Sequence, residues 1–420
     1  MKAAAKEQHR GGDPRAGATV AEPVEGSPLR LLVLPVSVTL AIQTLVAIAV
    51  FSAPVMAPVA GPDLGVQAAW IGYYIAFVYI GSMSGSVAAG ALVSRYGPIR
   101  MSQAGLVSCL GGLALAASSS FLPLVALGGF FVGLGYGPTT PASSQILVRA
   151  TPPSLIAMTF SLKQTGVPLG AGIAGAVVPT MLLFMGWRWS ALAIGVACVL
   201  LALVIQPTRA RYDTELNTTA KLSLRSAFAP LGFVFRDPRL TEMAVVSFIF
   251  AGVQITLVAY LVTFLIEAFE MSLVLAGMVM AASQLASMVG RILWGVVADR
   301  LLTRRVMLGL LGLGMGLSAL LTLAASPAWP VWLLFVYASA FGATAVGWNG
   351  VFLAEVARLA PPGKAGQATG GCMFFTFFGV VVSPPLFSQA LAFGGNYAGA
   401  YALFGSPALL AGAWLLLRQR

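Results

Sequence analysis

Two cationic side chains lie inside long apolar stretches of this 420-residue sequence, and they are the groups best suited to bind a polar ligand. Arg291 belongs to the stretch from Gln284 to Arg305, and Lys163 lies in the apolar run 155–185. A guanidinium does not lose its proton, and placing it in hydrocarbon costs on the order of 3 kcal/mol or more. Such a residue normally faces a protein interior or a water-filled path. We therefore treat both cations as candidate substrate contacts.

Each cation has a functional interpretation and a structural alternative. Counting back from Arg291 by helical turns gives Ser287 and Gln284, a polar stripe that would be costly to expose to lipid. The alternative is that Arg291 pairs with Asp299 or with carbonyl groups at helix ends. Lys163 shares its face with glycines, which suits contact with a neighbouring helix, and the alternative is that it extends to the inner membrane surface.

The elements that must position these residues are membrane helices. The chain is 58% hydrophobic and 9% charged, with a mean hydropathy of +0.90, which indicates a polytopic helical membrane protein. We expect an all-α fold of about twelve spanning helices, each long enough to cross the ~30 Å hydrocarbon core. The expected segments are 30–54, 68–93, 101–120, 122–147, 155–185, 187–207, 240–266, 273–298, 305–325, 329–357, 366–392 and 396–417.

The charge distribution predicts the orientation. With a cytoplasmic N-terminus, all of the 24 Lys and Arg residues except Lys163, Arg188 and Arg291 fall on the inner side. This asymmetry follows the positive-inside rule and accounts for the net charge of +11 without a nucleic-acid partner. We expect a protein integral to the lipid bilayer of a bacterial-type inner (plasma) membrane, with both termini cytoplasmic.

Other classes of function lack the residues they need. The only histidine, His9, lies in the polar N-terminal tail, and the three cysteines fall in apolar runs without metal-ligand spacing. The sequence contains no phosphate-binding P-loop and no Ser/His/Asp or Cys/His set. We therefore expect no enzymatic activity, no cofactor and no metal site.

The chain divides near its middle. We predict a disordered cytoplasmic tail at 1–28, a six-helix half at 29–207, a cytoplasmic linker at 208–239 and a second six-helix half at 240–420. An internal repeat supports this division, because similar sequences follow the second helix of each half at an offset of 205 residues. Glycine before the helix exit allows close helix contact, and the charges beyond it can hold the inner side shut. The residues expected to act in gating are Gly90, Arg95, Gly97, Arg100, Gly295, Asp299 and Arg300.

These repeats resemble the major facilitator superfamily. Its loop between helices 2 and 3 carries Gly-x-Leu-Ala-Asp-Arg-x-Gly-Arg-Lys, which Gly90, Arg95, Gly97 and Arg100 match, while Ser94 replaces the aspartate. Further matches are Gly133-Leu-Gly135, the run from Gly166 to Gly172, and Gly186-Trp187-Arg188. The resemblance covers about residues 30–418. It implies two pseudo-symmetric six-helix halves, a substrate site near the midplane and a monomeric protein.

Helix 8 narrows the resemblance. Gly290-Arg291, Gly295 and Asp299-Arg300 are similar to this helix in oxalate–formate exchangers and monocarboxylate carriers. The helix-8 arginine of those families contacts the substrate carboxylate, and Arg291 occupies its position. In the superfamily fold helices 5 and 8 meet between the halves, which would bring Lys163 close to the same substrate.

Uncharged residues could complete such a site. Helices 1, 4, 7 and 10 line the cavity of this superfamily, and polar residues on or near them are suited to hydrogen-bond a small ligand. Each could instead form a helix–helix hydrogen bond or pack in the core. The supporting candidates are Gln43, Tyr73, Tyr74, Gln254, Gln284, Trp348 and Asn349.

The absence of a central acidic residue favours an anionic substrate. Two buried cations without counter-carboxylates leave a positive field that an anion would neutralise. We predict a secondary transporter that moves a small organic anion, such as a carboxylate, as its two halves rock around the site. The alternatives are an exporter of neutral or amphipathic compounds and a non-transporting membrane sensor of the same fold. The sequence leaves substrate identity, direction and coupling ion open.

Overall fold

The computed structural model describes residues 28–152, 156–214, 216, 231–361, 365–394 and 396–418. Helices dominate this part of the chain, and no strand occurs within it. The expected tail, up to residue 27, and linker residues 217–230 lie outside the described residues. The prediction of an all-α fold is confirmed.

The structure contains the expected twelve membrane segments. Ten helical runs in the described residues are long and apolar enough to span a membrane. One of these runs, Leu162–Tyr212, combines two expected segments, because the helix continues on both sides of a kink at Gly186 (φ 67°, ψ 170°). Helix α2 (Ile71–Tyr96), with 26 residues, is long enough to supply the remaining span.

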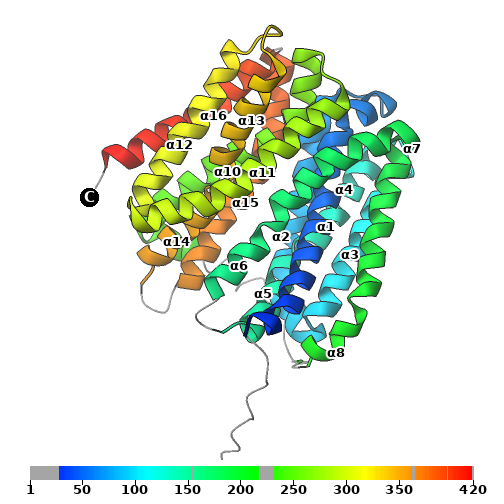
Figure 1. Cartoon of the computed structure of the whole chain (residues 1–420), viewed down its shortest axis with the longest axis vertical. Coiled ribbons are helices and arrows are strands. Elements are labelled where there is room, and N and C mark those ends of the chain that lie inside the picture. The colour runs from blue at the N-terminus through cyan, green and yellow to red at the C-terminus, as the bar shows by residue number, and fades with distance from the viewer. Residues whose placement is uncertain are drawn as a thin grey trace, which may run out of the picture.

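The first six segments form one bundle (Figure 1). Within it α1 packs against α7, α3 against both α4 and α7, and α2 against α4. Its elements are α1 (Pro28–Asp63), η1 (Ala68–Trp70), α2, α3 (Pro98–Ala117), α4 (Leu122–Tyr136), α5 (Thr139–Ala150), α6 (Ile156–Gln164), α7 (Gly166–Val204), η3 (Gln206–Thr208) and α8 (Arg209–Tyr212).

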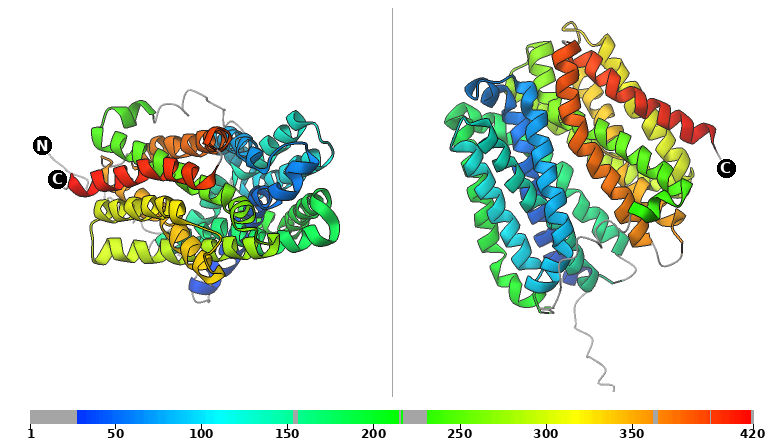
Figure 2. Two further views of the ribbon diagram at one scale, coloured as in Figure 1. Left: turned by 90° about the horizontal axis from the view of Figure 1, so that it is seen from above. Right: turned by 180° about the vertical axis from the view of Figure 1, so that it is seen from behind.

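The last six segments form the second bundle. Helix α12 packs against α16, α10 against α15 and α11 against α13. The elements are α10 (Pro238–Phe269), α11 (Leu273–Arg300), α12 (Arg304–Leu321), η4 (Thr322–Ala324), α13 (Val331–Ala345), α14 (Asn349–Leu359), α15 (Ala365–Gly394) and α16 (Tyr397–Leu417). Figure 2 shows the two bundles meeting at one end and diverging toward the other.

Equivalent spans of the two halves are broken in the middle. The expected segment 122–147 is divided into α4 and α5 at Gly137–Pro138, and 329–357 is divided into α13 and α14 at residues 346–348. Proline cannot donate a backbone hydrogen bond, which helps to end α4. Irregular backbone at membrane depth is tolerated where protein or a water-filled cavity surrounds it. At the second break the Val346 carbonyl oxygen accepts a hydrogen bond from a side chain of another helix, Arg291 on α11.

The halves touch at the end that carries Asp63 and Gly186, which the charge distribution predicts to be the outer end. Here a side-chain carbon on Gly277 of α11 would overlap the carbonyl oxygen of Gly175 on α7. The Tyr260 hydroxyl of α10 also lies 3.3 Å from the carbonyl oxygen of Ala69. We call the contacts of these four residues the outer junction, and they require glycine where the two backbones meet.

Ion pairs tie helices together within each half. In the first half Arg188 of α7 donates to Asp63 of α1 (2.9 Å), and the Trp187 indole donates to the same carboxylate (2.8 Å). In the second half Arg305 makes two hydrogen bonds to Glu242 (2.7 and 2.8 Å). The ion pairs given by the described residues are Asp63–Arg188, Arg209–Asp213, Asp299–Arg304, Glu242–Arg305 and Glu355–Arg358.

The Glu242 cluster should contribute to stability. Its carboxylate also accepts from the Trp414 indole (2.8 Å), so it joins α10, α12 and α16. We expect Glu242→Gln to destabilise the second half by about 2 kcal/mol, because it weakens charge-assisted hydrogen bonds, and to lower the thermal transition in detergent. Asp299→Asn is the control, since the Asp299 side chain is 62% exposed in its pair with Arg304 and such pairs contribute little. Equal transitions for both variants would contradict this role.

Candidate functional site

Arg291 lies where α11 passes the ends of two other helices. Its Nε donates to the Val346 carbonyl oxygen (3.2 Å), directly after α13, and NH1 reaches the Gln164 carbonyl oxygen (3.5 Å), at the end of α6. The last carbonyls of a helix lack intrahelical partners, and a cation suits their partial negative charge. A guanidinium has five N–H donors, so this partly exposed side chain retains donors for a ligand. The structural alternative for Arg291 was a pairing with Asp299 or with helix-end carbonyl groups. The carbonyl contacts are present, and Asp299 pairs with Arg304.

Lys163 is buried on α6. It contacts the side chain of Gln164, whereas Arg291 contacts the carbonyl oxygen of the same residue. Only 1% of the Lys163 surface is exposed, and Nζ lies 3.3 Å from the Thr140 hydroxyl and 3.3 Å from Gln164 Oε1. The structure therefore does not place it at the membrane surface. Neither Lys163 nor Arg291 pairs with a carboxylate in the part of the chain that the structure describes.

Gln164 brings the two cations into one site. Its carbonyl oxygen faces Arg291 and its side-chain oxygen faces Lys163, so we name Lys163, Gln164, Arg291 and Thr140 the cation pair site. Helices α5 and α7 both begin beside it, with Thr140 in the first turn of α5 and Gly166 at the start of α7. Helix N-termini add positive potential. The C-terminal ends of α6 and α13 also lie at this site and add negative potential, so its positive character comes from the two cationic side chains.

Two glutamines near this site have unpaired amide atoms. Gln284 on α11 is 2% exposed, and its Nε2 has no hydrogen-bond partner. Gln43 on α1 is 1% exposed with an unpaired Oε1, and its side chain contacts the backbone at Gly166. An unsatisfied buried polar atom costs about 1–3 kcal/mol. Both amides can therefore gain stability from a ligand or water.

Three further substrate candidates bind one another. Gln254 Oε1 on α10 accepts from the Trp348 indole (3.0 Å) and from Asn349 Nδ2 (3.1 Å). Trp348 is fully buried, whereas Gln254 and Asn349 are partly exposed. The network joins α10 to the break between α13 and α14, which is the helix–helix bond expected as the alternative role. It also brings these residues close to the Val346 carbonyl that Arg291 contacts.

Two gating residues of the first half, Gly97 and Arg100, lie against Asp213. Its carboxylate accepts from the backbone N–H groups of Ile99 (2.8 Å) and Arg100 (3.1 Å), at the start of α3. Gly97 has a φ of 93°, and a side chain there would collide with Asp213. The Arg95 guanidinium lies 5.5 Å from the centre of the Tyr96 ring. The surroundings of Gly90 lie outside the described side chains.

The gating residues of the second half are more exposed. Asp299 accepts from Arg304 (3.0 Å) across the turn between α11 and α12, and Arg300 is exposed. A side-chain carbon on Gly295 would meet nothing within 4 Å. The close helix contact expected at Gly295 is therefore absent in this structure, where the halves diverge at that end (Figure 2).

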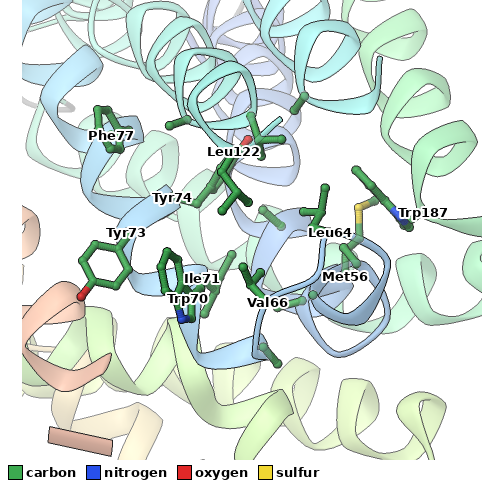
Figure 3. A pocket seen from close by; sticks show the side chains of 18 of the residues that line it. Met56, Leu64, Val66, Trp70, Ile71, Tyr73, Tyr74, Phe77, Leu122 and Trp187 are labelled. Atoms are coloured by element: carbon green, nitrogen blue, oxygen red, sulfur yellow. The ribbon is translucent and has the colours of Figure 1, made fainter. Parts of the chain in front are cut away.

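A separate apolar cavity of about 400 Å³ lies at the predicted outer end of the first half. Figure 3 shows Tyr74 pointing into it, with Trp70, Val66 and Leu64 around it. None of its lining residues belongs to the cation pair site. Tyr73, a supporting candidate, lines this cavity and contacts Gln389 of α15 through its hydroxyl.

Sequence reasoning missed Thr140, Gln164 and Tyr136. Thr140 and Gln164 contact Lys163 directly, and Tyr136 lies within electrostatic range of Arg291. All three flank helix breaks, and the Gly137–Pro138 dipeptide was the available signal for one of these breaks. No group of His, Cys, Asp and Glu in the described chain could hold a metal ion.

Comparison with known proteins places this fold in a known family. The sequence profile of the Major Facilitator Superfamily matches residues 39–384, and the chain belongs to this superfamily. It is thus a transporter of the major facilitator type. No curated protein matches the sequence.

Solved structures share the fold at low identity. A variant of the nucleoside transporter NupG has a TM-score of 0.76 and 15% identity, with 93% of this chain and 100% of that chain covered. A POT family transporter in complex with 5-aminolevulinic acid has a TM-score of 0.73 and 13% identity, covering 91% and 95%. A bacterial homologue of the human lysosomal transporter Spinster, inward-facing and unoccupied, has a TM-score of 0.68 and 14% identity, covering 93% and 96%.

Proposed function

We propose that this chain is a secondary transporter that binds a small organic anion, a carboxylate, at the cation pair site. The observation that supports this most is the pair of cations on either side of Gln164, neither matched by a carboxylate among the described residues. An anion between them offsets the cost of burying both charges. The similarity of the Arg291 stretch to helix 8 of carboxylate carriers points the same way.

Alternating access follows from the position of the site. Lys163 and Gln164 belong to the first half and Arg291 to the second, so a bound anion links the two halves. In the structure the halves are closed at the outer junction and diverge at the opposite end (Figure 1). The protein acts as a monomer in the inner membrane, with the diverging end toward the cytoplasm, as the positive-inside distribution predicts.

Transport assays test the proposal directly. Purified protein in liposomes should take up at least one member of a labelled panel of mono- and dicarboxylates, and an imposed pH gradient separates proton coupling from exchange. Lys163→Met should reduce this uptake about 10- to 100-fold, because a charge-assisted hydrogen bond contributes about 1.5–3 kcal/mol. Arg211→Met, on short helix α8, is a matched charge-removal control.

A second candidate function is export of neutral or amphipathic compounds. The observation that favours it is the apolar cavity of about 400 Å³ in the first half, which is lined almost wholly by apolar and aromatic groups. If folded protein transports neutral compounds and moves no acid in either direction, the export function replaces the anion proposal.

A further inference from the structure

An apolar crevice lies between the halves, within a helical turn of the cation pair site. Its volume is about 200 Å³, and it runs along the facing sides of α7 and α11. Nine residues line it: Pro168, Leu169, Gly172, Ile173, Ala176, Ala281, Gln284, Leu285 and Met288. We call it the α7–α11 crevice.

One end of the crevice lies next to the cation pair site. Met288 lies one turn before Arg291 on α11, and Pro168 lies in the first turn of α7, directly after the Gln164 segment that Arg291 contacts. The other end, at Ala176 and Ala281, stops beside the glycine contact of the outer junction. A molecule held by its charged group at the cations therefore has this crevice directly beside it.

The crevice has one polar side chain, and that side chain lacks a partner. Gln284 is the only polar residue of the lining, and its Nε2 is buried without a hydrogen bond. A purely structural contact between two apolar helices would not require a buried amide, whose unpaired donor is costly. Its Nε2 has almost no accessible surface, so a ligand in the crevice reaches this amide only if the Gln284 side chain changes its rotamer.

The crevice opens toward the exposed apolar flank of α11. Leu285 at its rim is 54% exposed, and the same flank of α11 continues through Val289 and Ile292, which are also exposed. Exposed apolar flanks of membrane helices face lipid tails. The crevice thus offers an apolar environment on all sides except at Gln284 and at its cationic end.

We propose that the transported anion is an aryl or alkyl carboxylate whose apolar body occupies the α7–α11 crevice while its carboxylate binds Arg291 and Lys163. This inference rests on the proposed function and specifies its substrate class. The volume suits it, because an apolar cavity of about 150 Å³ holds a benzene molecule.

Ligand-induced thermal shifts on purified full-length protein test this class without requiring transport. The probes are acetate, butyrate, hexanoate and phenylacetate. Each added methylene should lower the concentration for half-maximal shift about three- to fourfold, which corresponds to its burial from water. Phenylacetate should bind more tightly than acetate. Equal potency of all four acids, with binding still lost in Arg291→Gln, would overturn the crevice inference and leave the anion proposal standing.

A crevice-filling variant locates the apolar body. Gly172→Leu should abolish the dependence on chain length while acetate binding persists. A Cβ at this position lies 3.5 Å from the Gln284 Cβ, and the thermal transition of the variant without ligand reports whether the helix contact survives. Gly111→Leu is the matched control on α3, where nothing lies within 4 Å. Ala53→Leu fills the cavity of the first half instead. Loss of the chain-length dependence in Ala53→Leu but not in Gly172→Leu would overturn the inference.

Discussion

Arg291→Gln should abolish uptake of the anion, with a loss of at least about 30-fold, because removing one partner of a hydrogen-bonded charge pair costs about 2–5 kcal/mol. The guanidinium supplies donors that a glutamine amide cannot replace, and it carries the charge that the substrate neutralises. Initial rates of uptake into liposomes, at equal amounts of inserted protein, measure this effect.

Controls separate binding from folding in this variant. Arg291 also donates to the carbonyl oxygens of Val346 and Gln164, so its loss could loosen two helix ends. Arg291→Lys retains the charge and should recover part of the uptake, although a lysine cannot form the planar, two-pronged contact of arginine. The thermal transition of each variant reports on folding. Normal uptake by a folded Arg291→Gln protein would refute the role of this residue.

Gly277→Leu should prevent the outer junction from closing and reduce uptake at least about tenfold, since overpacking a close contact costs about 1–3 kcal/mol. A side chain at this position would overlap the carbonyl oxygen of Gly175 and also the ring of Pro179. The halves can accommodate it only by separating at this end. The variant therefore shifts the protein away from the conformation in Figure 1.

Labelling of a cysteine at the junction measures this shift. Ala69 is 9% exposed and lies against Tyr260 of the other half. In a background without the three native cysteines, Ala69→Cys should react slowly with a membrane-impermeant maleimide and faster once Gly277→Leu is added. Gly111→Leu on α3 is the control, because a side-chain carbon there meets nothing within 4 Å. Equal labelling rates in both variants would show that the glycine contact does not control access.

The topology followed from the sequence because lipid imposes one rule on every span. Backbone groups in hydrocarbon must be satisfied internally, so apolar runs of sufficient length become helices, and the segments from 30–54 to 396–417 appear as expected. The breaks beside Pro138 and Trp348 were not expected. Hydropathy is the same for a continuous helix and for two short ones, and only tertiary surroundings decide whether irregular backbone is tolerated.

The candidate site was predicted in part. Lys163 and Arg291 do approach the same residue, but the intermediary Gln164 was not foreseen, since its role depends on where α6 ends. Gln254, Trp348 and Asn349 bind one another across two helices. Spacing along the chain relates residues of one helix only, so mutual pairing between helices could not be read from it.

The distribution of ion pairs has a consequence for turnover. Every ion pair given by the described residues lies within one half. The described contacts between the halves at the outer end are instead close backbone approaches and hydrogen bonds that involve the hydroxyls of Tyr260 and Tyr73. Separating the halves there breaks none of these ion pairs. The free-energy difference between the two access states can then stay small, and a tenfold population change needs only about 1.4 kcal/mol. Under the proposed transport function, the free energy of the solute gradient then goes into moving the substrate and not into breaking ion pairs between the halves.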